Sequence, residues 1–339
     1  LTVRYCLKSA EPLLEKDHCA AYNQIVIRSY KAEAEFEKAK SPADGWLTVD
    51  RDTRTVKGAD FEVAFNGNGE LKSYVVAGQQ LLSKPLEPLF YRAMTENDYG
   101  VRKRATNSQY YHSWKMLRKA EKYMDLFTIE QLGSAVEVKS TYIYNELGMK
   151  VTITYTIDAN GRVAVKQTMI PGGHKLDIKG MLRYGVAFAM PEGFDNLEFY
   201  GAGGHESYAD RKSGAPIGIY SQSVDDQFCM TYSRPQESGA HCDLRYWKIT
   251  DDKGVGFKVL SNILFSATAI PYPMEQIDVL SDNYRKYPQL LEKDGNTYVN
   301  IDMAQSGIIC QNSWGAIPLE KYQIGYKKQE FEFVLIPVK

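Results

Sequence analysis

The sequence predicts an all-β protein built as a large antiparallel β sandwich, and three observations predict it. Alternating apolar and polar residues recur from about Trp46 to the end of the chain, separated by short turn sequences. Aromatic residues make up 12% of the chain, including 24 tyrosines, which is typical of strands. Strands and helices do not alternate and no glycine-rich phosphate loop is found, which favours a sandwich over a doubly wound sheet.

The first 45 residues are expected to lie outside this sandwich. Residues 1–8 and 20–28 alternate as two strands joined by a polar loop. Two strands are rarely stable alone, so we expect them to dock, to pair with another copy or to be disordered. The charged run and turn cluster at 31–45 predict a linker. The expected division is therefore 1–30, a linker at 31–45, and one large domain at 46–339.

Two hairpins and one helix are predicted within the large domain. Residues 61–76 form the first hairpin, with its turn at 66–69, where Asn-Gly steps tolerate positive φ. The clearest hairpin spans 149–170 with its turn at 158–161, and its first arm places four apolar residues on one face: Val151, Ile153, Tyr155 and Ile157. Residues 108–121 have the apolar spacing of a helix, with Trp114 and Leu117 on one side.

Charge and hydropathy exclude several classes of partner. The 41 lysines and arginines balance 42 aspartates and glutamates, so no overall field recruits nucleic acid or an acidic membrane surface. No apolar run approaches the roughly 20 residues that cross a bilayer. We therefore expect no nucleic-acid partner and no membrane partner.

Cysteine and histidine spacing predicts no metal site. The five cysteines are far apart and lack a CxxC spacing, although a Cys6–Cys19 bridge remains open. No two of the five histidines stand at ligand spacing.

Four segments follow one another in an order that resembles one enzyme family. They are the stretch at 85–100 with Arg92-Ala93 and Asn97-Asp98-Tyr99-Gly100, the run at 206–211, the run at 234–239, and 300–302 continuing to Ser313-Trp314-Gly315. Together they resemble the carboxyl-terminal region of bacterial glycoside hydrolase family 2 β-galactosidases, over nearly the whole chain. The resemblance implies a galactose mutarotase-like β-supersandwich at 46–339, preceded at 1–30 by the last strands of an incomplete immunoglobulin-like domain.

The same resemblance implies a part of an enzyme that lacks the catalytic groups. Retaining glycosidases use two carboxyl groups about 5 Å apart, and this family holds them in a barrel, for which the chain has no eightfold βα pattern. We expect the isolated chain to be inactive and to need the catalytic barrel domain as its partner, with a β-galactoside or related sugar as substrate. Metal ions belong to that barrel, and no cofactor is expected in this chain. Homo-oligomerisation and the choice between bacterial cytoplasm and periplasm stay open.

The resemblance also implies one wall of the active-site mouth. Trp314 matches a tryptophan that stacks on the sugar, and a flat indole suits a pyranose face. The expected substrate-binding residues are Trp314, Ser313, Asn312, Gly100 and Arg102, with Gly100 as a hinge of a mobile loop.

A second set of charged residues is expected to brace loops rather than to catalyse. Arginine–carboxylate forks satisfy polar groups at strand ends. The bracing set is Arg92, Asp98, Glu206, Tyr208, Asp210, Arg211, Arg234 and Glu237. The chain departs from the family pattern at Ile309, Cys310, Gln311 and Asn312, at Gly204-His205, and at Ser207 and Ser238. The changes beside Trp314 alter the hydrogen-bond partners offered to a sugar.

Two alternatives to the galactosidase interpretation remain. A mutarotase-like epimerase would need a general acid and a general base facing one cleft, for which His205 or His241 with Glu206 or Glu237 are candidates. A carbohydrate-binding or purely structural module would retain its sugar affinity, or its fold, without chemistry.

Overall fold

The computed structural model describes residues 1–172, 177–278, 287–308, 312 and 314–339, and these form two compact units, 1–31 and 32–339. The first unit is a hairpin of β1 (Thr2–Cys6) and β2 (Cys19–Gln24), so the two predicted strands are present. Cys6 stands opposite Cys19 across this hairpin, and both thiols are free.

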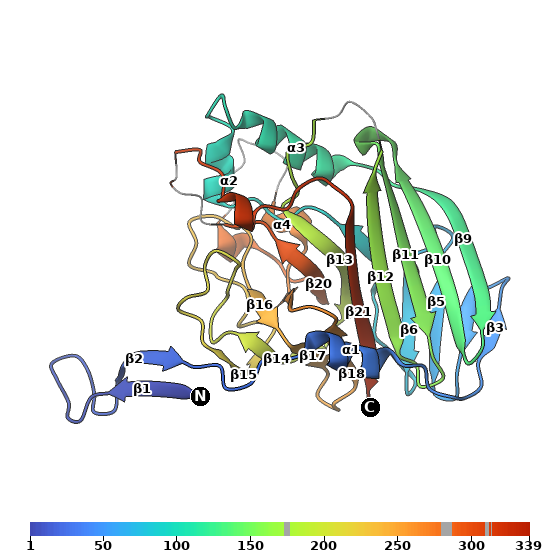
Figure 1. Ribbon diagram of the computed structural model, residues 1–339, viewed down its shortest axis with the longest axis horizontal. Helices are drawn as coiled ribbons and strands as arrows, with labels where there is room; N and C mark the ends of the chain where they lie inside the picture. The colour runs from blue at the N-terminus through green and yellow to red at the C-terminus, as the bar shows by residue number, and fades with distance from the viewer. Residues whose placement is uncertain (173–176, 279–286, 309–311, 313) are drawn as a thin grey trace. The chain divides into compact units, whose positions relative to one another are not determined.

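The second unit contains two antiparallel sheets (Figure 1). Within the described residues, the nine-stranded sheet has the order β15 (Ile217–Ser223), β14 (Asn196–Ala202), β17 (Tyr246–Thr250), β18 (Gly256–Ser261), β21 (Gln329–Val338), β12 (Val163–Pro171), β11 (Met149–Ile157), β10 (Ala135–Tyr144) and β9 (Tyr123–Leu132). The ten-stranded sheet has the order β16 (Ala240–Leu244), β19 (Phe265–Ile270), β20 (Asn296–Gln305), β13 (Arg183–Pro191), β8 (Lys84–Leu89), β6 (Leu71–Val76), β5 (Phe61–Phe65), β4 (Thr55–Lys57) and β3 (Thr48–Asp50), with β7 (Gln79–Gln80) paired to β6. The expected all-β antiparallel sandwich is confirmed.

The main core lies between the two sheets, and side-chain alternation builds it. Along β11 every second residue is buried in the main hydrophobic cluster, while the threonines between them are only partly buried. The predicted hairpin at 149–170 is confirmed, with Ile157 opposite Val163. Its turn is held by the Asp158 carboxylate, which accepts hydrogen bonds from two backbone N–H groups in the turn. The predicted hairpin of β5 and β6 is also confirmed.

A helix, α1 (Ala32–Lys40), lies in the segment for which the sequence predicted a linker. Acidic residues stand in its first turn and lysines in its last, which complements the helix dipole. Phe36 is fully buried beside Val334 of β21, so one apolar residue in a charged segment joins this helix to the sheet. Where the domain boundaries lie remains a prediction.

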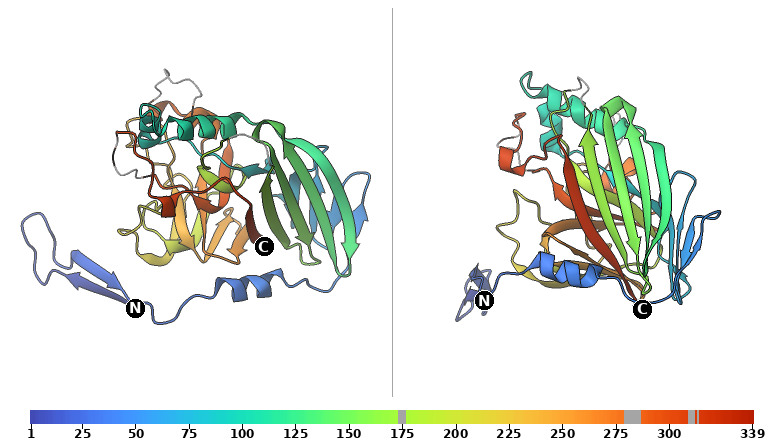
Figure 2. Two further views of the ribbon diagram at one scale, coloured as in Figure 1. Left: turned by 45° about the horizontal axis from the view of Figure 1, so that its top comes forward. Right: turned by 45° about the vertical axis from the view of Figure 1, so that its right-hand side comes forward.

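Three further helices are α2 (Glu96–Val101), α3 (Ser108–Lys119) and α4 (Met274–Ile277). Figure 2 shows α2 and α3 at one end of the two sheets in both views. The predicted helix at 108–121 is confirmed as α3, with Trp114 and Leu117 buried. Among the described residues, no helix has the length and apolar character needed to cross a membrane.

Candidate functional site

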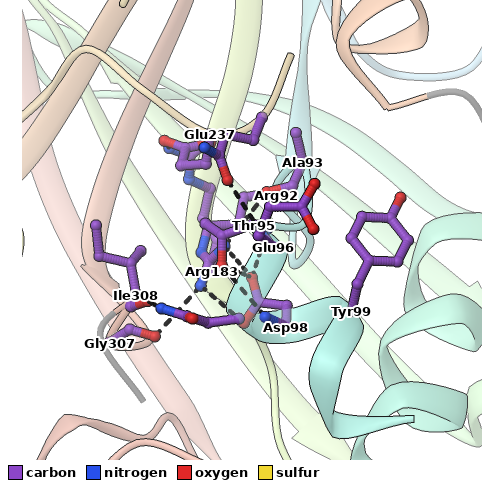
Figure 3. Close-up of polar contacts among 12 residues, drawn as sticks. Arg92, Ala93, Thr95, Glu96, Asp98, Tyr99, Arg183, Glu237, Gly307 and Ile308 are labelled. Carbon is purple, nitrogen blue, oxygen red and sulfur yellow. Dashed lines mark hydrogen bonds and ion pairs between the residues drawn. The ribbon is translucent and has the colours of Figure 1, made fainter. Parts of the chain in front are cut away.

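Arg92 and Asp98 form a fully buried ion pair at the start of α2 (Figure 3). The Arg92 Nη1 atom lies 2.6 Å from Asp98 Oδ2, and the same carboxylate accepts the Thr95 backbone N–H at 2.8 Å. Thr95 caps the helix in return, because its hydroxyl accepts the Asp98 N–H. Burial opposes the charge of Arg92, but the carboxylates of Asp98 and Glu237 outweigh it, so its pKa is raised. The segment 92–98 thus folds around its own ion pair.

A second buried cluster joins β13 to β20 through Arg183. Its guanidinium donates to Glu237 Oε1 at 2.9 Å and lies 3.1 Å from Asp302 Oδ2. Burial raises the pKa of Asp302 to about 8, and Glu237 adds to this effect while Arg183 opposes it. Burial also raises the pKa of Glu237 against the pull of both arginines. When Asp302 is protonated, the two buried arginines, Arg92 and Arg183, face the carboxylates of Asp98 and Glu237. The buried charges therefore balance near neutral pH.

Glu206 is the centre of a third cluster, in the loop after β14. Its carboxylate accepts hydrogen bonds from Arg211, from the Tyr232 hydroxyl and from the Gly239 backbone N–H, the last at 2.8 Å. The Tyr208 hydroxyl also donates to it, at 3.4 Å. The runs at 206–211 and 234–239, which are separate in sequence, therefore meet at one carboxylate.

Three side chains from two of these segments converge on the backbone of Gly307 and Ile308. Arg92 donates to the Gly307 carbonyl at 3.3 Å, and Asn97 Nδ2 donates to the Ile308 carbonyl at 3.0 Å. The Asp210 carboxylate accepts the Ile308 N–H at 3.0 Å. Together these contacts hold the backbone of Gly307 and Ile308.

Trp314 is the most conspicuous exposed aromatic residue at this end of the molecule, with 85% of its surface exposed. Its backbone N–H donates to Asn312 Oδ1 at 2.9 Å, and the carbonyl of Gly315 accepts from Asn107 Nδ2 at 2.7 Å. A Cβ atom at Gly315, whose φ is +92°, would stand 2.9 Å from the Gly100 carbonyl oxygen. Residues 100–107 and 314–315, which were expected beside one mouth, are therefore in contact.

The remaining predicted substrate-binding residues are placed differently. Gly100 lies inside α2, where its carbonyl accepts the N–H groups of Arg102 and Lys103, so it sits in a helix rather than in the expected loop. Arg102 is exposed and ends that helix. Ser313 lies outside the described residues, as do Ile309, Cys310 and Gln311.

Arg234 also reaches α2. Its guanidinium lies 3.9 Å from the centre of the Tyr99 ring and 3.5 Å from Glu96 Oε1. Of the two serines that depart from the family pattern, Ser207 donates to the Ala202 carbonyl and accepts the Cys242 N–H, while Ser238 accepts the Cys229 N–H. Both serines are buried and serve the backbone.

A cavity of about 580 Å³ lies over the ten-stranded sheet, and Glu237 and Arg183 are among its lining residues. No histidine lines it within the described chain. His241 is buried, stacks on Phe199 with ring centres 4.1 Å apart and bonds Gln227, and its pKa falls to about 4 because of burial. His205 bonds two backbone carbonyls on the surface. The histidine–glutamate pairs considered for an epimerase are therefore not gathered in this cavity.

Arg183, Asp302, Asn97 and Asn107 were not nominated from the sequence. A signal for Arg183 existed, because arginine is rarely buried without a partner and Arg183 stands alone in the apolar run 181–190. Asn97 stands in the Asn97-Asp98-Tyr99-Gly100 motif and Asp302 in the segment 300–302, but neither was given a role, and Asn107 carries no comparable signal. Among the described residues, no group of three or more His, Cys, Asp or Glu side chains could hold a metal ion.

The fold and this network define an all-β domain with an exposed tryptophan and a network of buried ion pairs. The family described as β-galactosidase small chain matches residues 57–335. A β-galactosidase of Halalkalibacterium halodurans is 31% identical over 336 residues, covering 97% of this chain and 31% of that protein. The β-galactosidase BgaC of Bifidobacterium adolescentis is 30% identical over 312 residues, covering 90% of this chain and 28% of that protein. The chain belongs to the β-galactosidase small-chain family, and it spans under a third of the length of these relatives.

Solved structures with similar folds share little sequence with the chain. Galactose 1-epimerase of Lactobacillus acidophilus aligns with a TM-score of 0.43 and 9% identity, covering 84% of this chain and 93% of that one. The family 36 α-galactosidase AgaA of Geobacillus stearothermophilus aligns with a TM-score of 0.39 and 12% identity, covering 86% and 40%.

Proposed function

We propose that this chain is the carboxyl-terminal part of a β-galactosidase and supplies one wall of the active-site mouth, while a large chain supplies the catalytic carboxylates. The observation that carries the proposal is the exposed Trp314, whose neighbours along the chain, Gly307, Ile308 and Gly315, accept hydrogen bonds from side chains of other segments. An apolar ring exposed to water suits stacking on a sugar face. β-Galactosides are the proposed substrate class, because the relatives are named as β-galactosidases.

The bracing residues support this proposal through their position. Arg92, Asn97 and Asp210 bond Gly307 and Ile308, six to seven residues before Trp314 along the chain. Buried charge pairs with several hydrogen bonds specify one arrangement more than they add stability. We assign these residues the role of holding the backbone of Gly307 and Ile308, which precede Trp314 along the chain, in one position.

Hydrolysis of nitrophenyl β-galactoside tests the proposal. The chain is assayed alone and after mixing with the large chain of the enzyme, as wild type and as Trp314→Ala. We expect no turnover by the chain alone, restored turnover on mixing, and a kcat/KM roughly tenfold lower for Trp314→Ala, since about 1.4 kcal/mol of stacking corresponds to a factor of ten.

Trp46→Ala is the matched control, because Trp46 is also exposed, at 75%, but belongs to none of the clusters described above. This control should leave the restored activity unchanged. Turnover by the chain alone would show that it holds its own catalytic pair. Failure to restore activity, or equal losses in the two tryptophan variants, would instead favour a binding or structural module.

A further inference from the structure

The outer face of the ten-stranded sheet is hollowed along β13. Successive residues of a strand point to opposite faces. Along β13 the core face carries Tyr184, Val186 and Phe188, and the outer face carries Gly185, Ala187 and Ala189. Of these small residues Ala187 lines the depression, and longer side chains of β8 and β20 flank it, among them Glu87 and Asn300, both opposite Ala187.

The cavity of about 580 Å³ occupies this depression. The end of α3, α4 and residues 236–238 supply its other walls. Its volume falls within the roughly 300–1,000 Å³ of small-molecule sites. Trp314 is not among its lining residues, so this cavity is separate from the tryptophan wall.

The charges around the cavity cancel. Its charged lining residues are four cations and four anions: Lys84, Arg118, Lys122, Arg183, Glu87, Glu121, Glu237 and Glu275. Most are paired with one another, as Lys122 is with Glu87 at 2.5 Å and Arg183 with Glu237 at 2.9 Å. A cavity whose charges are internally compensated offers no net attraction to an ionic ligand, and favours a neutral one.

The remaining groups combine apolar rings with an amide that is free to bind. Tyr91 and Tyr298 line the cavity, and their hydroxyls bond Asp278 and Asp294. Arg118 lies 5.8 Å from the centre of the Tyr91 ring and Lys84 lies 4.7 Å from that of Tyr298, so each tyrosine offers a ligand the part of its ring that these groups leave open. Asn300 lies on the sheet between Ala187 and Thr268, and no hydrogen bond to its side chain is found within the described residues. A primary amide presents two donors and one acceptor, which matches the neighbouring hydroxyls of a sugar.

We propose that this cavity binds a neutral mono- or disaccharide. The tyrosine rings contact the apolar face of the pyranose, and the Asn300 amide bonds its hydroxyls. Thr268 and the Arg183–Glu237 pair line the same cavity and provide further hydrogen-bonding groups. This site is additional to the proposed tryptophan wall and does not depend on it.

Calorimetric titration of the full chain with galactose, glucose and lactose tests the inference. We expect at least one of these sugars to bind, and the charged analogues galacturonic acid and galactosamine to bind more weakly. Ala187→Leu should fill the depression and weaken binding at least tenfold. Asn300→Ala, a smaller change, should also weaken sugar binding. If circular dichroism shows that Ala187→Leu does not fold, the affinity of Asn300→Ala becomes the test of the cavity site.

Trp314→Ala is the control that separates the two sites and should leave the affinity unchanged. The inference is overturned if no neutral sugar binds, if folded Ala187→Leu and Asn300→Ala bind as wild type does, or if a charged analogue binds more tightly. If Trp314→Ala loses sugar binding while Ala187→Leu and Asn300→Ala keep it, the sugar binds at the tryptophan wall. That result would also overturn the cavity site.

Discussion

The buried carboxyl groups set how single residues respond to pH. Glu237 and Asp302 share Arg183, and all three side chains are buried, so both carboxylates cannot be ionised without a cost. Asp302 takes the proton because burial raises its pKa to about 8. The Asp302 Oδ2 atom lies 3.1 Å from Arg183 Nε, and neither carboxyl oxygen of Asp302 has a hydrogen-bond partner among the described residues.

Replacement of Asp302 by Asn should make stability less dependent on pH. The carboxyl group has an ordinary pKa of 3.8 and a pKa of about 8 in the folded chain. Below pH 4 it is protonated in both states, so its contribution is fully present there. Between pH 4 and 8 only the unfolded state ionises, so the free energy of unfolding of the wild type falls as pH rises, by at most about 1.4 kcal/mol per pH unit.

Urea unfolding at pH 5, 7 and 9 measures this effect. The stability of Asp302→Asn relative to wild type should rise from pH 5 to about pH 8 and then level off. Asp52→Asn, the same substitution at an exposed position, is the matched control. A relative stability of Asp302→Asn that declined with rising pH would contradict the assignment of the proton.

Close contact between neighbouring strands is the main constraint on β13. A Cβ atom at Gly185 would stand 2.3 Å from the Ile301 carbonyl oxygen and 2.4 Å from Asp302 Oδ1. The first neighbour is backbone and cannot rotate away. Glycine at this position therefore lets β13 and β20 approach while the Asp302 carboxyl lies over the gap.

Gly185→Ala should lower the free energy of unfolding by about 1–3 kcal/mol, as overpacking does in other cores. Gly67→Ala is the matched control, because a Cβ atom there has no neighbour within 4 Å and the residue has no positive φ. That control should be neutral or slightly stabilising. Urea denaturation compares the two variants, and equal effects would argue against the close approach.

The chain as a whole divides between Lys31 and Ala32, and α1 belongs to the larger unit because Phe36 is buried there. Truncation tests this division. Removal of 1–31 should leave the urea midpoint of the sandwich unchanged. Removal of 1–40 also takes away Phe36 and should cost about 3 kcal/mol or more, the usual effect of losing a buried phenylalanine. Equal losses in the two truncations would place the boundary after α1.

Local signals explain why much of the fold was predictable. Alternation along β11 and the Asp158 turn depend on neighbours within a few residues, and the spacing of Trp114 and Leu117 predicted α3 for the same reason. The helix α1 was missed because its single large apolar residue, Phe36, carries no periodicity.

The candidate site was predictable only in pieces. The motif segments and Trp314 were recognised along the chain, and the Arg92–Asp98 pair spans seven residues. Their convergence on Gly307 and Ile308 joins residues more than 90 positions apart, for which one sequence holds no signal. Ser313 lies outside the described residues, and its role stays a prediction.

The sequence by itself determined the all-β class, the hairpins, the long helix and the family resemblance, because side-chain period and turn chemistry act over short stretches. Tertiary structure alone decided the strand order of the sheets, the raised pKa of Asp302 beside Arg183 and the depression over β13. Those features depend on which distant strands lie side by side and on how far their packing excludes water, and both are set only when the two sheets close on their core.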